Sequence, residues 1–476
     1  MTSVKSAAGS LPLLLTAAGG CAMSMVDTNM IAVAVPSVTR AFGADPLAGQ
    51  WVISAFFLSF AASLMAAGAI ADRFGRRRTY LSGLWALAMT STLSGLAGNL
   101  FLLQVSRFAQ GMAMAFVLAP ALAMIGQRFR SPAEATRAWL IWGAIMGGTT
   151  ALSPLLGGWL VETFGWRAGF LVNVPLCTAL ILATLRYSHE SYGERERRLD
   201  LPGILLFAAA MFAMAWALIN GQAHGWLHPA TLAGAAGGIL ALAGFGLAEK
   251  MQLSPMIPLA LFTDRNFIGA VFGMFAYAAT AQVMASLLPI FLQYQAGLTA
   301  GEAGRTMLPF ALAMLAFPFV GAWLGRRFLS RTVLVFGFLI VAAGNFLAAW
   351  GAFICDWPLL LSGFAVLGSG AGILNSESQK AIMATIPASH SGIASGISTT
   401  TRFTGILLGF AGLNALASGA RSIVADGHRT GPAPGLAVDP EMLAFSMTFL
   451  AAGLFAAVSA SLLLLLLHRD GVRSRT

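Results

Sequence analysis

The chain has 476 residues, of which 58% are hydrophobic and only 10% are charged. Soluble globular proteins carry roughly 25% charged residues, so this composition excludes a soluble enzyme, a disordered chain and a coiled coil. The net charge of +10 comes from basic residues between apolar runs, which indicates orientation in a membrane rather than binding to nucleic acid.

Fourteen apolar runs are long enough to cross a bilayer, because roughly 20 helical residues span its hydrocarbon core. Each run is expected to be helical, since backbone groups in lipid must find their hydrogen bonds within the segment. In chain order the runs cover residues 11–38, 47–71, 79–98, 100–125, 138–161, 169–187, 201–220, 229–247, 267–294, 304–324, 332–352, 358–386, 392–416 and 443–467. The sequence therefore predicts an all-α polytopic membrane protein.

Basic residues fall mainly in one set of alternate loops. Arg76 and its neighbours follow the second run, Arg128 follows the fourth and Arg326 follows the tenth. Cytoplasmic loops of membrane proteins are enriched in Lys and Arg. We therefore expect both termini to be cytoplasmic in a multi-pass protein of the cytoplasmic (inner) membrane.

An internal repeat divides the chain. A glycine-rich helix end precedes an arginine cluster twice, at residues 68–76 and again at 321–327. Many secondary transporters are built from such repeated halves. We expect a six-helix bundle over 1–187, a linker with two inserted helices over 188–265, and a second six-helix bundle over 266–476. The mixed charges of residues 188–200 predict a solvated linker.

The first run contains Asp27, and the fourth contains Arg107. Helical rise places these residues about 16 Å and about 10 Å below the outer helix ends, so an arginine side chain could bridge them. An ionisable group within a membrane span marks a transport pathway or a proton relay. The alternative is a structural ion pair. Met23 and Met30, on the same run as Asp27, offer either an adaptable substrate surface or ordinary packing.

The twelfth run carries unusual polarity, with Asn375 and Glu377 in its interior. This predicts a helix that lines a water-filled cavity. Glu377 lies at a depth similar to Arg402 of the thirteenth run, and Lys380 follows it on the same helical face. Either cation could neutralise Glu377; otherwise the acid is free to bind a cationic substrate or a proton.

Several motifs resemble one known family. Residues 68–76 (GAIADRFGR) are similar to the loop 2–3 motif of the major facilitator superfamily. Residues 27–36, 103–111 and 143–158 resemble motifs of its fourteen-helix drug:proton antiporter branch, although Ser153 stands where that branch usually has glycine. The resemblance implies two six-helix bundles plus two inserted helices.

The resemblance also implies roles for individual residues. Proton coupling would fall to Asp27 and Arg107, and the substrate cavity would include Glu377, Asn375, Met23, Met30 and Arg402. Gating would involve Gly68, Asp72, Arg73, Gly75 and Arg76. The antiporter motif would comprise Gly143, Gly147, Ser153, Pro154, Gly157 and Gly158.

The function expected from these features is proton-coupled export of small amphipathic drugs, cationic or neutral, by alternating access. The alternative is a dedicated exporter or proton symporter of one endogenous metabolite. We expect a secondary transporter and not an enzyme, with no cofactor and no metal, driven by the proton gradient. Its partners would be small-molecule substrates, protons and the lipid bilayer, with no nucleic acid. We expect a monomer, and the sequence leaves a periplasmic adaptor open.

Overall fold

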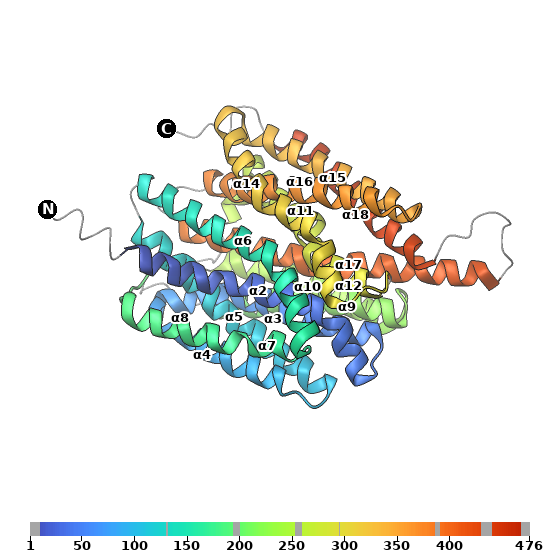
Figure 1. Cartoon of the computed structure of the whole chain (residues 1–476). Coiled ribbons are helices and arrows are strands. Elements are labelled where there is room, and N and C mark those ends of the chain that lie inside the picture. The colour runs from blue at the N-terminus through green and yellow to red at the C-terminus, as the bar shows by residue number, and fades with distance from the viewer. Residues whose placement is uncertain are drawn as a thin grey trace. The chain divides into compact units, whose positions relative to one another are not determined.

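The computed structural model describes residues 10–129, 132–193, 200–252, 259–294, 296–385, 391–429 and 440–467 (Figure 1). These residues form helices and connecting loops, with no strand among them. The N-terminal helices are α2 (Ser10–Phe42), α3 (Pro46–Phe74), α4 (Arg76–Gly95), α5 (Leu100–Arg128), α6 (Pro132–Phe164), α7 (Ala168–Leu171) and α8 (Asn173–Tyr187). Two further helices follow, α9 (Leu201–His224) and α10 (Pro229–Met251).

The remaining elements begin with a short 3-10 helix and include one π-helical turn. They are η1 (Leu259–Thr263), α11 (Arg265–Tyr277), the π turn η2 (Ala278–Gln282), α12 (Met284–Tyr294), α13 (Ala300–Thr306), α14 (Leu308–Arg327), α15 (Ser330–Phe353), α16 (Trp357–Thr385), α17 (Ser391–Arg429) and α18 (Pro440–Leu466). The predicted ninth span thus forms a helix with a π-helical turn in its middle, from α11 through η2 to α12.

The chain divides into two compact units. Unit 1 comprises residues 1–212, 238–259 and 388–400, and unit 2 comprises residues 213–237, 260–387 and 401–476. The helices α9 and α10 are therefore shared between the units. The expected division at residues 187 and 265 stays a prediction.

Twelve helical stretches among the described residues are long and apolar enough to cross a membrane. Two predicted spans, 79–98 and 392–416, form α4 and the first part of α17, but these helices are not among the twelve. Both are rich in Ser, Thr and Gly, which lowers their hydropathy. In α4 the hydroxyls of Thr90 and Thr92 donate to backbone carbonyls of the preceding turn. The count of fourteen spans stays a prediction.

In unit 1, α5 packs against α2, α3 and α4, and α2 packs also against α6 and α8. Small residues permit the close approach of these helices. A Cβ atom at Gly83 of α4, for example, would lie 2.6 Å from the backbone carbonyl carbon of Phe116 in α5. This packing turns Asp27 of α2 toward α5 and α8.

In unit 2, α16 packs against α14 and α15, and α11 packs against α16 and α18. Glycine again sets the spacing, since a Cβ atom at Gly344 of α15 would lie 2.6 Å from the Cα atom of Leu367 in α16.

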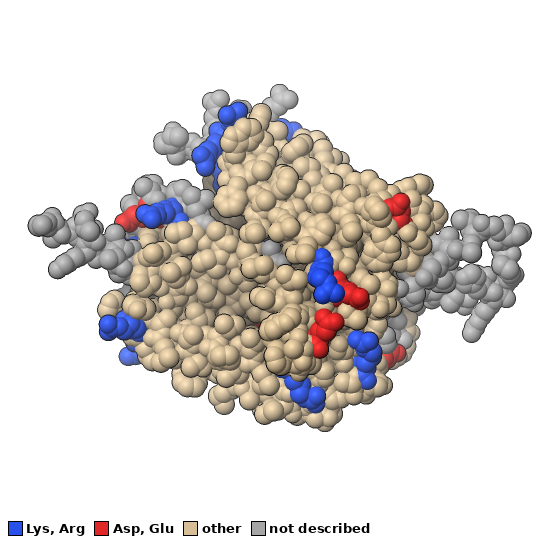
Figure 2. Space-filling model, viewed as in Figure 1, with Lys and Arg blue, Asp and Glu red and all other residues tan. Residues whose placement is uncertain are grey.

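The molecular surface is suited to lipid. Trp85, Leu205 and Leu240 are each at least 60% exposed, and a soluble protein rarely leaves large apolar patches uncovered. In the view of Figure 2 the sides of the helices carry few charged side chains, which gather toward helix ends. Exposed apolar flanks with charged ends are the arrangement that a bilayer requires.

Candidate functional site

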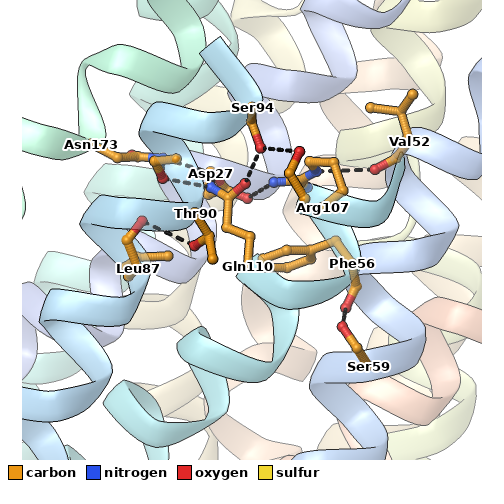
Figure 3. Close-up of polar contacts among 12 residues, drawn as sticks. Asp27, Val52, Phe56, Ser59, Leu87, Thr90, Ser94, Arg107, Gln110 and Asn173 are labelled. Atoms are coloured by element: carbon orange, nitrogen blue, oxygen red, sulfur yellow. Dashed lines mark hydrogen bonds and ion pairs between the residues drawn. The ribbon is translucent and has the colours of Figure 1, made fainter. Parts of the chain in front are cut away.

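The carboxylate of Asp27 is completely buried in the middle of α2 and lies at the centre of a polar network. Its Oδ2 atom accepts a hydrogen bond from Nη1 of Arg107 at 2.6 Å. Its Oδ1 atom accepts from Nε2 of Gln110 at 2.6 Å and from Nδ2 of Asn173 at 2.9 Å (Figure 3). The three donors, one of them cationic, complement a negatively charged carboxylate.

Arg107 is held in place by more than this ion pair. Its side chain is 1% exposed, and its Nε atom donates to the carbonyl of Val52 in α3 at 3.0 Å. The guanidinium carbon lies 4.3 Å from the ring centroid of Phe56, a favourable cation–π distance. Contacts from α3 thus fix the cation independently of Asp27. The structure places Asp27 and Arg107 together, as the helical depths predicted.

Hydroxyl groups of α4 extend the network. Ser91 accepts from Gln110 at 2.8 Å and from Asn173 at 3.2 Å, and Ser94 donates to Oε1 of Gln110 at 3.2 Å. The sequence patterns predicted no role for Gln110, Asn173 or these serines. Two features of the sequence could have indicated such a role. Gln110 is an amide one turn after Arg107, and the serines lie in the least apolar of the predicted spans. The polarity of α4 therefore has a structural use, because it completes the shell around Asp27.

The second intramembrane acid, Glu377 of α16, is also buried, with 2% of its side chain exposed. Nζ of Lys380 lies 3.3 Å from its Oε1 atom and also donates to the carbonyl of Gly325 in α14 at 2.9 Å. Of the two cations considered from the sequence, Lys380 is the observed partner. Asn375 is partly buried on the same helix.

Arg402 of α17 is 6% exposed and makes a different contact. Its guanidinium carbon lies 6.0 Å from the ring centroid of Tyr277 in α11. Its Nη2 atom has no hydrogen-bond partner among the described residues.

The gating residues expected after the second span form a compact charge network. Arg76 donates to Oδ1 of Asp72 at 2.9 Å, to Oε1 of Gln127 at 2.6 Å and to the carbonyl of Ala123 at 3.2 Å. One guanidinium therefore ties the end of α3 and the start of α4 to the last turns of α5. Gly68 of α3 faces α5, where a Cβ atom would lie 4.0 Å from Ala119, and Arg73 is exposed.

The segment after α8 packs against this network, which corrects the expectation of a solvated linker for residues 188–193. Oε1 of Glu190 accepts from the backbone N–H of Arg77 at 3.0 Å, and Oε2 accepts from the N–H of Arg78 at 3.2 Å. Gly75, the N-cap residue of α4, has no side chain to cap the helix and adopts φ 113°, which favours glycine. Glu190 thus caps α4 from a distant part of the chain. The rest of the charged stretch, 194–199, lies outside the described residues.

The expected antiporter motif lies in α6. The Ser153 hydroxyl donates to the carbonyl of Thr149 at 2.5 Å, directly before Pro154. Proline and a serine bond of this kind both bend helices. A Cβ atom at Gly157 would lie 2.9 Å from Cγ of Met30, so α6 and α2 approach closely there. Gly147 and Gly158 are buried as well, and Gly143 is partly buried.

The two methionines expected in the substrate cavity, Met23 and Met30 of α2, are both in the core. Met30 packs on Gly157, and the Met23 sulfur lies 3.8 Å from the Cys177 sulfur of α8. These contacts occupy both side chains within the packing of unit 1.

The chain is similar to known membrane transport proteins. The Major Facilitator Superfamily profile matches residues 17–410. The chain is 33% identical over 418 residues to Multidrug resistance protein Stp of Mycobacterium tuberculosis. The aligned region covers 87% of this chain and 78% of that protein. It is 34% identical to the Tetracenomycin C resistance and export protein of Streptomyces glaucescens over 70% of this chain and 62% of that protein.

Among solved structures, the peptide transporter POT in complex with sulfate matches with a TM-score of 0.67 and 16% identity, over 96% of this chain and 94% of that one. This likeness shows the fold alone. The family match and the relatives indicate a small-molecule transporter embedded in a membrane rather than an enzyme. The chain belongs to the Major Facilitator Superfamily.

Proposed function

We propose that this protein is a proton-coupled antiporter that exports small amphipathic drugs across the cytoplasmic membrane by alternating access. Similarity to proteins named for multidrug resistance and antibiotic export supports drug efflux. The observation that carries the coupling proposal is the completely buried Asp27 carboxylate, which receives hydrogen bonds from α5 and α8. When a buried acid of this kind gains or loses a proton, the hydrogen bonds that hold its helix to the neighbouring helices change.

The proposed step begins with ionised Asp27, which ties α2 to α5 through Arg107 and Gln110 and to α8 through Asn173. Protonation removes the negative charge and weakens the attraction to Arg107. Arg107 stays in place because Val52 and Phe56 hold it. The helix α2 is then released from α5 and is free to shift. Release of the proton restores the ties and resets the transporter.

The network of Asp72 and Arg76 is the proposed gate. It joins α3, α4 and α5, and Glu190 attaches the segment after α8 to the same point. A charge network at helix ends can hold one access state closed without touching the substrate.

The membrane potential is sufficient for this exchange. A charge gains about 2.3 kcal/mol per 100 mV, so about 150 mV supplies roughly 3.5 kcal/mol per proton. Since 1.4 kcal/mol is a factor of ten, one proton supports roughly a 300-fold drug gradient when net charge moves.

The proposed topology has fourteen spans and both termini in the cytoplasm. Reporter fusions after Ser191 and after Arg429 should then report opposite sides of the membrane. If both fusions report the same side, the proposed number of spans is wrong.

The test of function is dye efflux from proteoliposomes with an imposed pH gradient. Wild-type protein and Glu162→Gln, which neutralises an exposed acid of α6, should transport against the dye gradient. Asp27→Asn should lose gradient-driven transport and still allow downhill exchange. Transport along the same direction as the proton would favour a symporter, and gradient-driven transport by Asp27→Asn would contradict the proposed role of this residue.

A further inference from the structure

Unit 2 contains two buried donors without partners. The Nη2 atom of Arg402 and the hydroxyl of Tyr277 are both buried and have no hydrogen-bond partner among the described residues. The Arg402 side chain is 6% exposed, and Tyr277 is fully buried beside it. Buried polar groups are normally paired, and an unpaired one is costly. The guanidinium carbon of Arg402 lies 6.0 Å from the ring centroid of Tyr277, so the two unpaired donors belong to neighbouring side chains.

No carboxylate of unit 2 fills this place among the acids whose side chains are described. Glu377 pairs with Lys380. The other three acids lie at helix starts, where Asp264 caps α11, Glu302 bonds to the N-terminus of α13 and Asp356 accepts from the first turn of α16. None of these four described acids is therefore a counter-ion of Arg402.

The backbone around the two donors is rigidly packed. Gly405 and Gly409 lie one and two turns after Arg402 on the same face of α17. A Cβ atom at Gly405 would lie 2.6 Å from the carbonyl oxygen of Phe275, and one at Gly409 would lie 2.7 Å from the Cα atom of Ala279. Glycines thus allow α17 to press against the segment that carries Tyr277.

The helix geometry at Tyr277 is also unusual. The π-helical turn Ala278–Gln282 begins directly after it, and such turns are frequent at functional sites. A close helix contact on one side and a π-helical turn on the other fix both side chains before a ligand arrives. Donors held in position in this way lose little freedom on binding.

We propose that Arg402 and Tyr277 form a substrate subsite that binds an anionic oxygen, a carboxylate or an ionised phenol, on an otherwise apolar compound. Arginine forms charge-assisted hydrogen bonds to carboxylates, and the tyrosine hydroxyl adds the second unpaired donor. This subsite extends the expected range of cationic and neutral drugs to amphipathic acids. It rests on the proposed function, because the ligand is the exported compound.

The test uses three compounds with one apolar body: pyrenebutyrate, its methyl ester and pyrenebutyl trimethylammonium. Binding to purified protein in detergent is followed by pyrene fluorescence. Arg402→Gln should weaken pyrenebutyrate binding roughly tenfold or more, because a hydrogen bond to a charged group is lost. Tyr277→Phe, which keeps the ring, should weaken it about threefold. Arg402→Lys should restore part of the affinity, and the methyl ester should bind each variant within about twofold of wild type.

An equal loss for acid and ester would show that the residues only support the fold and would overturn the subsite. Unchanged pyrenebutyrate binding in both variants, or no binding to the wild type, would overturn it as well. Because this measurement needs no gradient, it is separable from the proposed function. If none of the three compounds is transported in proteoliposomes while the acid-specific losses appear, the subsite stands and the export proposal fails.

Discussion

In unit 1, Nη1 of Arg107 lies 2.6 Å from Oδ2 of Asp27. In unit 2, Glu377 instead pairs with its neighbour Lys380, and Arg402 contacts an aromatic ring. The first pair joins two helices, and the second pair lies within one helix. A charge change at Asp27 therefore alters contacts between helices, while one at Glu377 alters a local contact. This difference supports the proposed proton coupling at Asp27 and the proposed ligand site at Arg402.

The largest expected effect comes from removing Arg107, with removal of Arg402 as the comparison. Arg107→Gln leaves the buried Asp27 carboxylate without its cation and should lower the free energy of unfolding by roughly 3–5 kcal/mol. Arg402→Gln removes a buried cation that has no described carboxylate partner and should not lower the free energy of unfolding, because an uncompensated buried charge is itself costly. Unfolding of both variants in detergent, followed by circular dichroism, compares them directly. Equal losses would erase the contrast between the two units.

Asp72→Asn should have the next largest effect. Because Arg76 loses its anionic partner at the proposed gate, transport of every compound should slow by the same factor, several-fold, with unchanged binding affinity. Transport rates of the three pyrene compounds in proteoliposomes provide the measurement. Glu190→Gln, which weakens the cap on α4, should slow transport less. Selective loss of one compound would instead place Asp72 in substrate recognition.

Glu377→Gln should have a smaller effect that depends on the compound. Lys380 then loses its anion, so transport of pyrenebutyl trimethylammonium should fall a few-fold while transport of the methyl ester stays coupled to the proton gradient. The pair adds little to stability because the Lys380 side chain is 46% exposed. Loss of coupling for the uncharged ester would move the proton site to unit 2.

The smallest effect is expected at Glu302, whose backbone and side-chain bonds to Thr299 lower the pKa of this exposed carboxyl from 4.5. A lowered pKa adds stability that is present above the unfolded value and is lost as pH falls through the folded value. Glu302→Gln should therefore lower the melting temperature slightly at pH 7. The difference from wild type should shrink as the pH falls below 4.5. A difference that grows in acid would have the wrong sign.

The sequence predicted the helical fold and the meeting of Asp27 and Arg107 because both follow from hydrophobic length and helical rise. It could not predict the shell of Gln110, Asn173 and Ser91, since an amide or hydroxyl within a span does not reveal which way it faces. The sequence left Lys380 and Arg402 as two candidate partners for Glu377, because the depth of a residue along its helix does not fix its side-chain rotamer.

The segment after α8 shows the same limit. Its mixed charges are typical of a solvated loop, and no local pattern indicates that Glu190 caps a helix more than 100 residues earlier. Gly75 has no side chain to cap α4, so the start of this helix needs an acceptor from elsewhere in the chain. The sequence alone does not show that Glu190 supplies it. Tertiary contacts of this kind lie beyond periodicity and composition.

The central claim is that Asp27 carries the proton, and proton release on ligand binding tests it most directly. Pyrenebutyl trimethylammonium, which carries no exchangeable proton, is added to purified protein in weakly buffered detergent with a pH-sensitive dye. We predict proton release from the wild type and from Glu377→Gln, and none from Asp27→Asn, because a bound cation stabilises the carboxylate of Asp27. Release from Asp27→Asn together with none from Glu377→Gln would contradict the account and reverse the roles of the two acids.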